Sequence, residues 1–202
     1  MQRSPQERDS LAAIRRDLGQ YARLLIGIVA ILWVIEIVNL GVFQGSLIRW
    51  GVIPRTTQGL PGILLHPLLH GGIAHLATNS LGFLMLGGLV VVREVRDFWL
   101  ATLLGTVIGG AGTWAIGRPG PHVGLSGVIF AYLGYLLTTG WFDRRVGSII
   151  ISVFALLCWG TALFGLLPTQ SGISWEGHLF GFLGGVLTAA LRPKMRRAQA
   201  AA

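Results

Sequence analysis

Three short motifs place a serine, two histidines and an asparagine near the ends of long apolar stretches. Ser126 lies in the string GLSG, His178 ends the string WEGH, and His75 and Asn79 lie within HGGIAHLATN (residues 70–79). A serine hydroxyl is a weak nucleophile until a base removes its proton, and histidine is the usual base. Ser126 and His178 are therefore candidates for a nucleophile and its general base.

The sequence offers no carboxylate to orient His178 as in a catalytic triad. Glu176 is two residues away, on a different face of the expected helix. A Ser–His dyad suits a membrane, because a buried carboxylate is costly to ionise there. A neutral histidine needs only a hydrogen bond to fix its tautomer. Phe130, one turn after Ser126, is placed to stack against the histidine ring.

Peptide hydrolysis also needs hydrogen-bond donors aimed at the developing oxyanion. The backbone N–H of Ser126 is one candidate, because it lies at a helix N-terminus with its partial positive charge. The His75 imidazole and the Asn79 amide are two more, one turn apart on one helix face. Gly124, just before the serine, allows the loop backbone to come close.

The composition is that of a helical membrane protein. Of 202 residues, 52% are apolar, only 12% are charged and 30 are glycine, and the mean hydropathy is +0.66. A soluble domain usually carries about a quarter charged residues. Six apolar runs are candidates to cross a bilayer, at about residues 24–44, 63–92, 98–116, 124–141, 147–167 and 177–191, the last of them short. We therefore expect an all-α fold, a compact bundle of six transmembrane helices.

Basic residues at the ends of these runs predict the topology. With ends assigned alternately, thirteen basic residues fall on one side and only Arg49, Arg55 and Arg118 on the other. Basic residues mark the cytoplasmic side. Both termini are then cytoplasmic, and the net charge of +8 is a topology signal that does not call for nucleic acid.

The expected organisation has three parts. They are a cytoplasmic N-terminal tail or surface helix (residues 1–22), a six-span domain (23–192) and a basic cytoplasmic tail (193–202). A cleaved signal peptide is not expected, because no small-x-small site follows the first apolar run. The protein is expected in a bacterial cytoplasmic membrane.

The candidate residues share one depth. At 1.5 Å of rise per residue, Ser126, His178 and Asn79 lie roughly 22, 21 and 20 Å above the inner boundary. In a hydrocarbon core about 30 Å thick, that level is the outer third. Three separate spans thus bring polar groups to one height.

Small residues give the fourth and sixth runs faces that can pack closely. In the sixth run they repeat every four positions, at Gly177, Gly181, Gly185 and Ala189. Such a stripe lets another backbone approach. In the fourth run Gly127 lies beside the face that carries Ser126. Contact between the two faces would bring the Ser126 hydroxyl within reach of His178.

Together these motifs resemble the rhomboid family of intramembrane serine proteases, over roughly residues 46–191. The matching strings are GxSG at 124–127, HGxxHxxxN at 70–79 and HxxGxxxG at 178–185. The family's Trp-Arg pair of the first loop is absent, and Gly59-Leu60-Pro61-Gly62 occupies that region.

The resemblance implies a role for each matching residue. Ser126 would be the nucleophile and His178 the base, with His75 and Asn79 as oxyanion donors and Gly124 in the oxyanion environment. It implies cleavage of transmembrane proteins near the outer face. It also implies that the fifth run and the loop after it (167–174) are the mobile part that admits substrate.

Three other functions are compatible with parts of the sequence: binding of client helices, transport and metal binding. A non-catalytic rhomboid-like protein would bind client transmembrane helices without cutting them. A transporter is expected to show midplane charges or broken helices in matching halves, and neither is evident. His66 and His70 have the i, i+4 spacing of a metal pair, but no HExxH pattern or third ligand accompanies them, so no metal or cofactor is expected. Glu36 and Asn39 are unusual residues for the first run, and a protonated or hydrogen-bonded structural group is the simplest interpretation of Glu36. The sequence leaves the role of Glu36 open. The sequence does not predict an oligomeric state.

Overall fold

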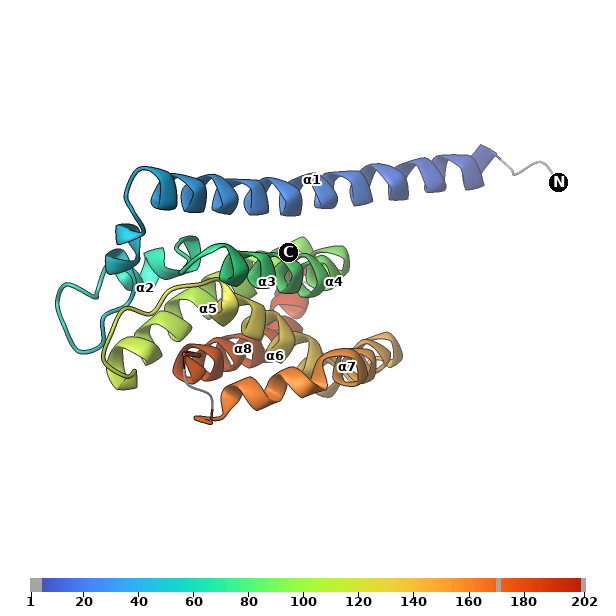
Figure 1. Cartoon of the computed structure of the whole chain (residues 1–202). Coiled ribbons are helices and arrows are strands. Elements are labelled where there is room, and N and C mark those ends of the chain that lie inside the picture. The colour runs from blue at the N-terminus through green and yellow to red at the C-terminus, as the bar shows by residue number, and fades with distance from the viewer. Residues whose placement is uncertain (1–4, 170–171, 201–202) are drawn as a thin grey trace.

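The computed structural model describes residues 5–169 and 172–200, and these fold into a helical bundle (Figure 1). The elements are α1 (Pro5–Gly41), η1 (Ser46–Trp50), α2 (Gly62–Leu65), η2 (His66–Leu68), α3 (Ile73–Gly82), η3 (Phe83–Gly87), α4 (Gly88–Arg93), α5 (Val95–Ile116), α6 (Ser126–Asp143), α7 (Val146–Trp159), η4 (Gly160–Leu166) and α8 (Trp175–Ala200). No β-strand occurs in these residues, so the predicted all-α class is confirmed for them.

Four helical segments are long and apolar enough to cross a membrane. They are Ala12–Gly41, Ile73–Arg93, Val95–Ile116 and Val146–Leu166. The second joins α3, the π-helical η3 and α4 into one helix, and the fourth joins α7 to the 3-10 helix η4. The remaining long helices, α6 and α8, carry the candidate serine and histidine.

Two helical segments differ in extent from the apolar runs of the sequence. α1 begins at Pro5 and runs without a break across residues 22 and 23, along one side of the bundle and beyond it (Figure 1). The apolar run expected at 63–92 is interrupted before α3. Pro67 ends the preceding short helix, and Gly72 adopts a φ of 118°, which favours glycine. His66 and His70 therefore lie in the connection that leads into α3.

α6 is the centre of the bundle, and α8 packs against it more closely than side chains would allow. A Cβ on Gly181 would overlap the carbonyl oxygen of Gly127, and a Cβ on Gly185 would overlap that of Ala131. On another face of α8, a Cβ on Gly184 would lie 2.8 Å from the Leu104 carbonyl oxygen of α5. The small residues of α8 thus hold it between α5 and α6 at backbone distance.

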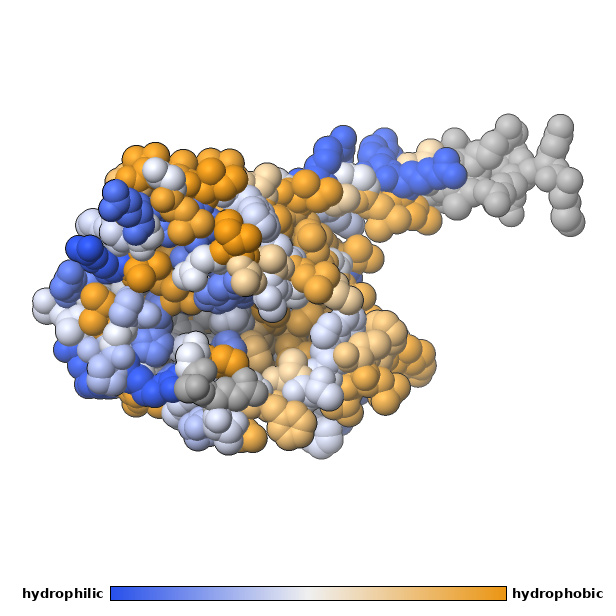
Figure 2. Space-filling model, in the orientation of Figure 1, coloured by the Kyte–Doolittle hydropathy of each residue, from blue (hydrophilic) through white to orange (hydrophobic). Residues whose placement is uncertain are grey.

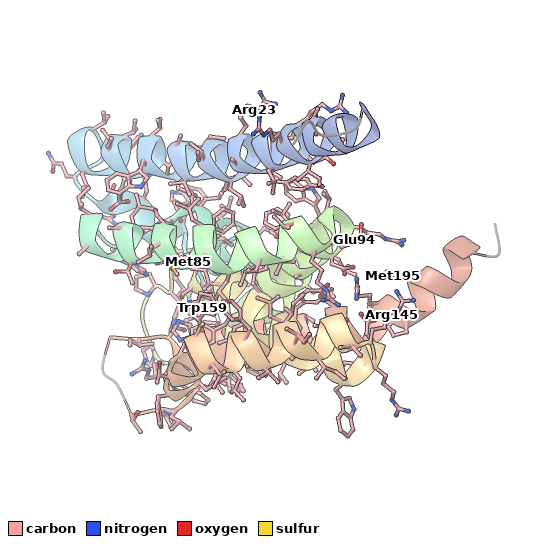
Figure 3. The ribbon with its side chains drawn as sticks, turned by 90° about the vertical axis from the view of Figure 1, so that its right-hand side faces the viewer. Arg23, Met85, Glu94, Arg145, Trp159 and Met195 are labelled. Carbon is pink, nitrogen blue, oxygen red and sulfur yellow. The ribbon has the colours of Figure 1, made fainter. Side chains whose placement is uncertain are left out.

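A buried charged cluster joins five helices at the end of the bundle away from Ser126. Arg93 of α4 donates to Asp143 of α6 at 2.8 Å and to Ser148 of α7. Arg192 of α8 pairs with Asp97 of α5 at 2.6 Å and also with Asp143. Each charge has an opposite partner, as buried charges require. Glu94, Arg145 and Met195 lie at this same end (Figure 3).

α7 is the most exposed of the apolar helices. Only 6% of its most apolar window is buried, compared with 44% for the helix Ile73–Arg93. The space-filling view shows a notch with hydrophobic sides between α1 and α7 (Figure 2). Side chains such as Leu157 and Ile150 are exposed on α7. Such surfaces suit contact with lipid tails rather than water.

Candidate active site

Ser126 and His178 meet where α6 and α8 begin. Ser126 is the first residue of α6, and His178 lies in the first turn of α8. The Nε2 atom of His178 is 2.9 Å from the Ser126 hydroxyl oxygen, within hydrogen-bond distance. The two helices reach this distance because Gly127, directly after Ser126, and Gly181, one turn after His178, let their backbones come together.

The other ring nitrogen of His178 settles the direction of that bond. Its Nδ1 is 3.0 Å from the carbonyl oxygen of Gly165, in η4. A carbonyl can only accept, so Nδ1 carries the proton and Nε2 is free to accept from the Ser126 hydroxyl. The Phe130 ring is stacked on the imidazole, with centroids 4.1 Å apart and an interplanar angle of 13°. The imidazole is thus fixed in tautomer and in orientation.

His75 and Asn79 of α3 approach the loop just before the serine. A Cβ on Gly124 would lie 2.7 Å from His75 Nε2 and 3.6 Å from Asn79 Nδ2. Gly124 has a φ of 120°, which L side chains rarely adopt. One N–H of the Asn79 amide donates to the His75 carbonyl at 2.9 Å, and the amide has a second N–H. Glycine is therefore required here both by its backbone conformation and by the two side chains against it.

A small cavity of about 20 Å³ adjoins Ser126, with His66, His122 and Ser174 among the residues that line it. A cavity of this size has room for one water molecule. His66 is held by the backbone of the short helix before it. Its Nδ1 lies 3.1 Å from the carbonyl oxygens of both Gly62 and Ile63.

The loop before α6 is tied to the start of α8. His122 Nε2 donates to the Arg118 carbonyl at 2.8 Å, so its Nδ1 accepts from the Ser174 hydroxyl, also at 2.8 Å. Buried Glu176 accepts from the Arg118 backbone N–H and pairs with its guanidinium at 3.5 Å. These contacts hold the loop that carries Gly124 against the helix that carries His178.

The chain matches the Rhomboid domain over residues 57–194, a region that contains all of these residues. The chain belongs to the rhomboid family. An uncharacterised protein of Mycobacterium tuberculosis is 37% identical over 173 residues, covering 81% of this chain and 71% of the relative. An uncharacterised protein of Mycobacterium leprae is 36% identical over 171 residues, covering 80% and 67%. The rhomboid protease GluP of Bacillus subtilis is 34% identical over 161 residues, covering 76% of this chain and 29% of GluP.

Within this rhomboid domain, the structure brings together all the residues singled out from the sequence motifs. Ser126 and His178 are hydrogen-bonded, His75 and Asn79 lie against Gly124, and the small residues of α8 lie against α6 and α5. Gly177 lies between these two helices, because a Cβ there would meet Thr113 of α5, and a Cβ on Gly127 of α6 would lie 3.3 Å from the Gly177 carbonyl oxygen. Buried His70 packs edge-on against His75 with centroids 5.2 Å apart.

Sequence reasoning missed three contributors to this site. The Gly165 carbonyl fixes the His178 tautomer, but a backbone oxygen leaves no signal in a sequence. His122 was overlooked, although a histidine four residues before the serine is visible in the sequence. Glu176 is not predicted to orient His178, because it lies on a different helix face. In the structure its carboxylate accepts from the backbone N–H of Arg118, in the loop before α6.

Proposed function

We propose that this rhomboid protein is an intramembrane serine endopeptidase that cuts transmembrane proteins near the outer membrane face. Ser126 is the nucleophile and His178 the general base. The observation that carries the proposal is the 2.9 Å hydrogen bond from the Ser126 hydroxyl to His178 Nε2, in a ring whose Nδ1 is held by the Gly165 carbonyl. This is the nucleophile–base–orienting-group arrangement of serine hydrolases, with a carbonyl in place of the acid.

The first half of the reaction forms an acyl-enzyme. Ser126 Oγ attacks the scissile carbonyl carbon while His178 Nε2 takes the hydroxyl proton. The imidazolium keeps its Nδ1–H bond to Gly165 O, so the positive charge is stabilised without a buried carboxylate. His178 then gives the Nε2 proton to the leaving amine as the peptide bond breaks.

The oxyanion of the tetrahedral intermediate needs donors fixed before the reaction begins. The Ser126 N–H, the Asn79 amide and the His75 Nε2 are proposed for this role. Support comes from the approach of both side chains to Gly124, where a Cβ would lie 2.7 Å from His75 Nε2. Removing one such donor typically costs about 100- to 1000-fold in turnover.

Water completes the reaction by attacking the acyl-enzyme carbonyl, with His178 again taking a proton. The cavity of about 20 Å³ beside Ser126 is a place where one water can wait. The polar side chains of His66, His122 and Ser174 line it, which favours water over a lipid tail. The substrate is proposed to approach between α7 and the helix Ile73–Arg93, because the segment formed by α7 and η4 has the smallest buried share of the four candidate spans.

We propose that six segments cross the membrane, namely α1 from residue 23 onward, the helix Ile73–Arg93, α5, α6, α7 with η4, and α8 up to residue 192. The terminal parts, residues 1–22 and 193–202, lie outside these segments. Both termini then face the cytoplasm. The excess of basic residues on that side supports this orientation. The proposed location is a bacterial cytoplasmic membrane.

A cleavage assay on a single-span substrate in detergent micelles tests the proposal. The wild-type protein is expected to yield two fragments on a gel, and Ser126→Ala and His178→Ala are expected to yield none. Asn79→Ala should lower turnover by roughly 10- to 1000-fold with little change in KM. Ser80→Ala is the matched control, because Ser80 is a buried serine bonded to Trp33 and the Leu76 carbonyl. If wild-type protein binds the substrate but leaves it intact, the non-catalytic alternative is correct.

A further inference from the structure

A carboxylate of α1 reaches the start of the helix that carries His75. Glu36 is 1% exposed, and its Oε1 accepts from the backbone N–H of Gly72 at 2.8 Å. Its Oε2 accepts from the Asn39 side chain at 3.1 Å. Asn39 in turn accepts from the Leu47 N–H at 3.0 Å, which fixes the amide. Both oxygens of Glu36 are therefore held, one of them by the turn before α3.

The position of this carboxylate is unusual for a membrane segment. Burying an ionisable group in a span is costly, so such groups usually have a function. Among the side chains that the structure describes, no basic one pairs with Glu36. Its partners are instead two N–H donors, and the Gly72 N–H lies at the N-terminus of α3, where negative charge is favourable. The carboxylate thus stabilises this turn specifically.

The turn held by Glu36 is in direct contact with His75. The N–H of Gly71, next to Gly72, points to His75 Nδ1 at 3.3 Å. An N–H can only donate, so Nδ1 accepts and the ring proton lies on Nε2. Nε2 is the atom that approaches Gly124 beside the serine. The tautomer of His75 that can donate to an oxyanion is therefore the one that the Gly71–Gly72 turn selects.

We infer that Glu36 is a positioning residue for the oxyanion site. It acts through the Gly71–Gly72 turn to keep His75 protonated on Nε2 and directed at Gly124. The inference rests on the proposed function of His75 as an oxyanion donor. It assigns a role to α1, which lies outside the matched Rhomboid domain of residues 57–194.

Steady-state cleavage by full-length Glu36→Ala protein tests the inference. Small misplacements of positioned groups cost up to about 100-fold, so kcat is expected to fall by roughly 10- to 100-fold with KM nearly unchanged. Glu36→Gln keeps an acceptor for the Gly72 N–H and is expected to restore most of kcat. In a His75→Ala background, Glu36→Ala is expected to cause no further loss, because the two act through one interaction.

Trp33→Phe is the matched control. Trp33 lies one turn before Glu36 on α1 and donates to Ser80 of α3 at 3.1 Å, so the substitution also removes a hydrogen bond between these helices. It does not touch the Gly71–Gly72 turn. Its kcat is expected to equal that of the wild type. An equal loss of kcat in Trp33→Phe and Glu36→Ala would show that Glu36 only joins the helices and would overturn the inference.

Nitrogen-15 NMR of histidine-labelled protein gives a readout that does not depend on cleavage. The His75 signals, identified by their absence in His75→Ala, are expected to show a protonated Nε2 in the wild type and in Glu36→Gln. Glu36→Ala is expected to show a mixture of tautomers. If wild-type protein fails to cleave while this difference is seen, the proposed function is wrong, and only the effect of Glu36 on the His75 tautomer stands. Identical His75 signals in wild type and Glu36→Ala would refute the positioning role itself.

Discussion

The two helices that flank α6, α8 and α7, are packed in opposite ways. α8 lies against α6 at backbone distance, with Gly181 on Gly127 and Gly185 on Ala131. α7 approaches α6 closely in its first half, where a Cβ on Gly140 would lie 2.9 Å from Ile149 Cα and the Ser152 hydroxyl donates to the Leu136 carbonyl at 2.7 Å. Over α7 and η4 together, only 6% of the most apolar window is buried.

This difference assigns separate tasks to the two sides of α6. The α8 side sets the short distance between Ser126 and His178, because its glycines let the two backbones pack closely. The α7 side has fewer buried contacts. Local opening therefore costs the least free energy on that side. One contact joins the two sides. The Gly165 carbonyl, in the 3-10 helix that continues α7, orients His178 on α8.

The largest effect is expected from adding bulk between α6 and α8. Gly181→Leu should lower the melting temperature strongly and abolish cleavage, because a side chain there would overlap the Gly127 carbonyl. Gly147→Leu in α7 is the control, since a Cβ on Gly147 meets nothing within 4 Å. Thermal unfolding and the cleavage assay compare the two variants. Equal tolerance of both would contradict the proposed difference between α8 and α7.

A reversible cross-link should block transmembrane substrates without unfolding the protein. Met85 of η3 and Trp159 of α7 lie on the two segments on either side of the proposed access path (Figure 3). A cleavable bis-maleimide joining Met85→Cys to Trp159→Cys, in a Cys158→Ser background, should stop cleavage until the linker is cut. Each single-cysteine protein treated alike is the control. Full activity of the cross-linked protein would place substrate access elsewhere.

The contact between η4 and His178 predicts an intermediate effect. A Cβ on Gly165 would lie 2.9 Å from the Phe130 ring and 3.3 Å from His178 Nδ1. Gly165→Ala should therefore displace the carbonyl and lower kcat by roughly 10- to 100-fold, with KM and melting temperature little changed. Gly160→Ala, at the start of the same 3-10 helix, should keep normal kcat. A normal kcat for Gly165→Ala would mean that His178 needs no acceptor at Nδ1.

The smallest effect is expected from loosening α7 further. Phe154 and Trp159 form an edge-to-face pair with centroids 5.9 Å apart. Phe154→Ala should lower the free energy of unfolding by about 1 kcal/mol, the value of such a pair. Cleavage of a transmembrane substrate should be equal or faster, since α7 contributes no side chain to the Ser126–His178 contact. A large loss of cleavage in a stable Phe154→Ala protein would argue that α7 must stay closed for activity.

Sequence patterns predicted the α8 side better than the α7 side. The four-residue repeat of small residues indicated close packing, and the shared depth of Ser126 and His178 indicated their meeting. Helical periodicity carries such information because it fixes which residues share a face. The loop expected at residues 167–174 includes Gln170 and Ser171, which lie outside the described residues.

Contacts made by backbone atoms and by irregular segments escaped prediction. The Gly165 carbonyl and the Gly71 N–H orient the two histidines of the site, yet any residue type presents these groups. Glu36 was noticed as a polar residue in an apolar run, but only the fold shows that it reaches Gly72. The spacing of residues along one helix does not predict which distant loop a side chain of that helix will contact.

Reactivity of Ser126 with a serine-directed fluorophosphonate tests the dyad most directly, because it needs no knowledge of the substrate. Intact-mass analysis of the wild-type protein is expected to show one adduct, which peptide mapping assigns to Ser126. Ser126→Ala should take up none, and His178→Ala should react far more slowly, since the base that activates the hydroxyl is gone. Equal labelling of the wild type and His178→Ala, or an adduct on another residue, would contradict the account.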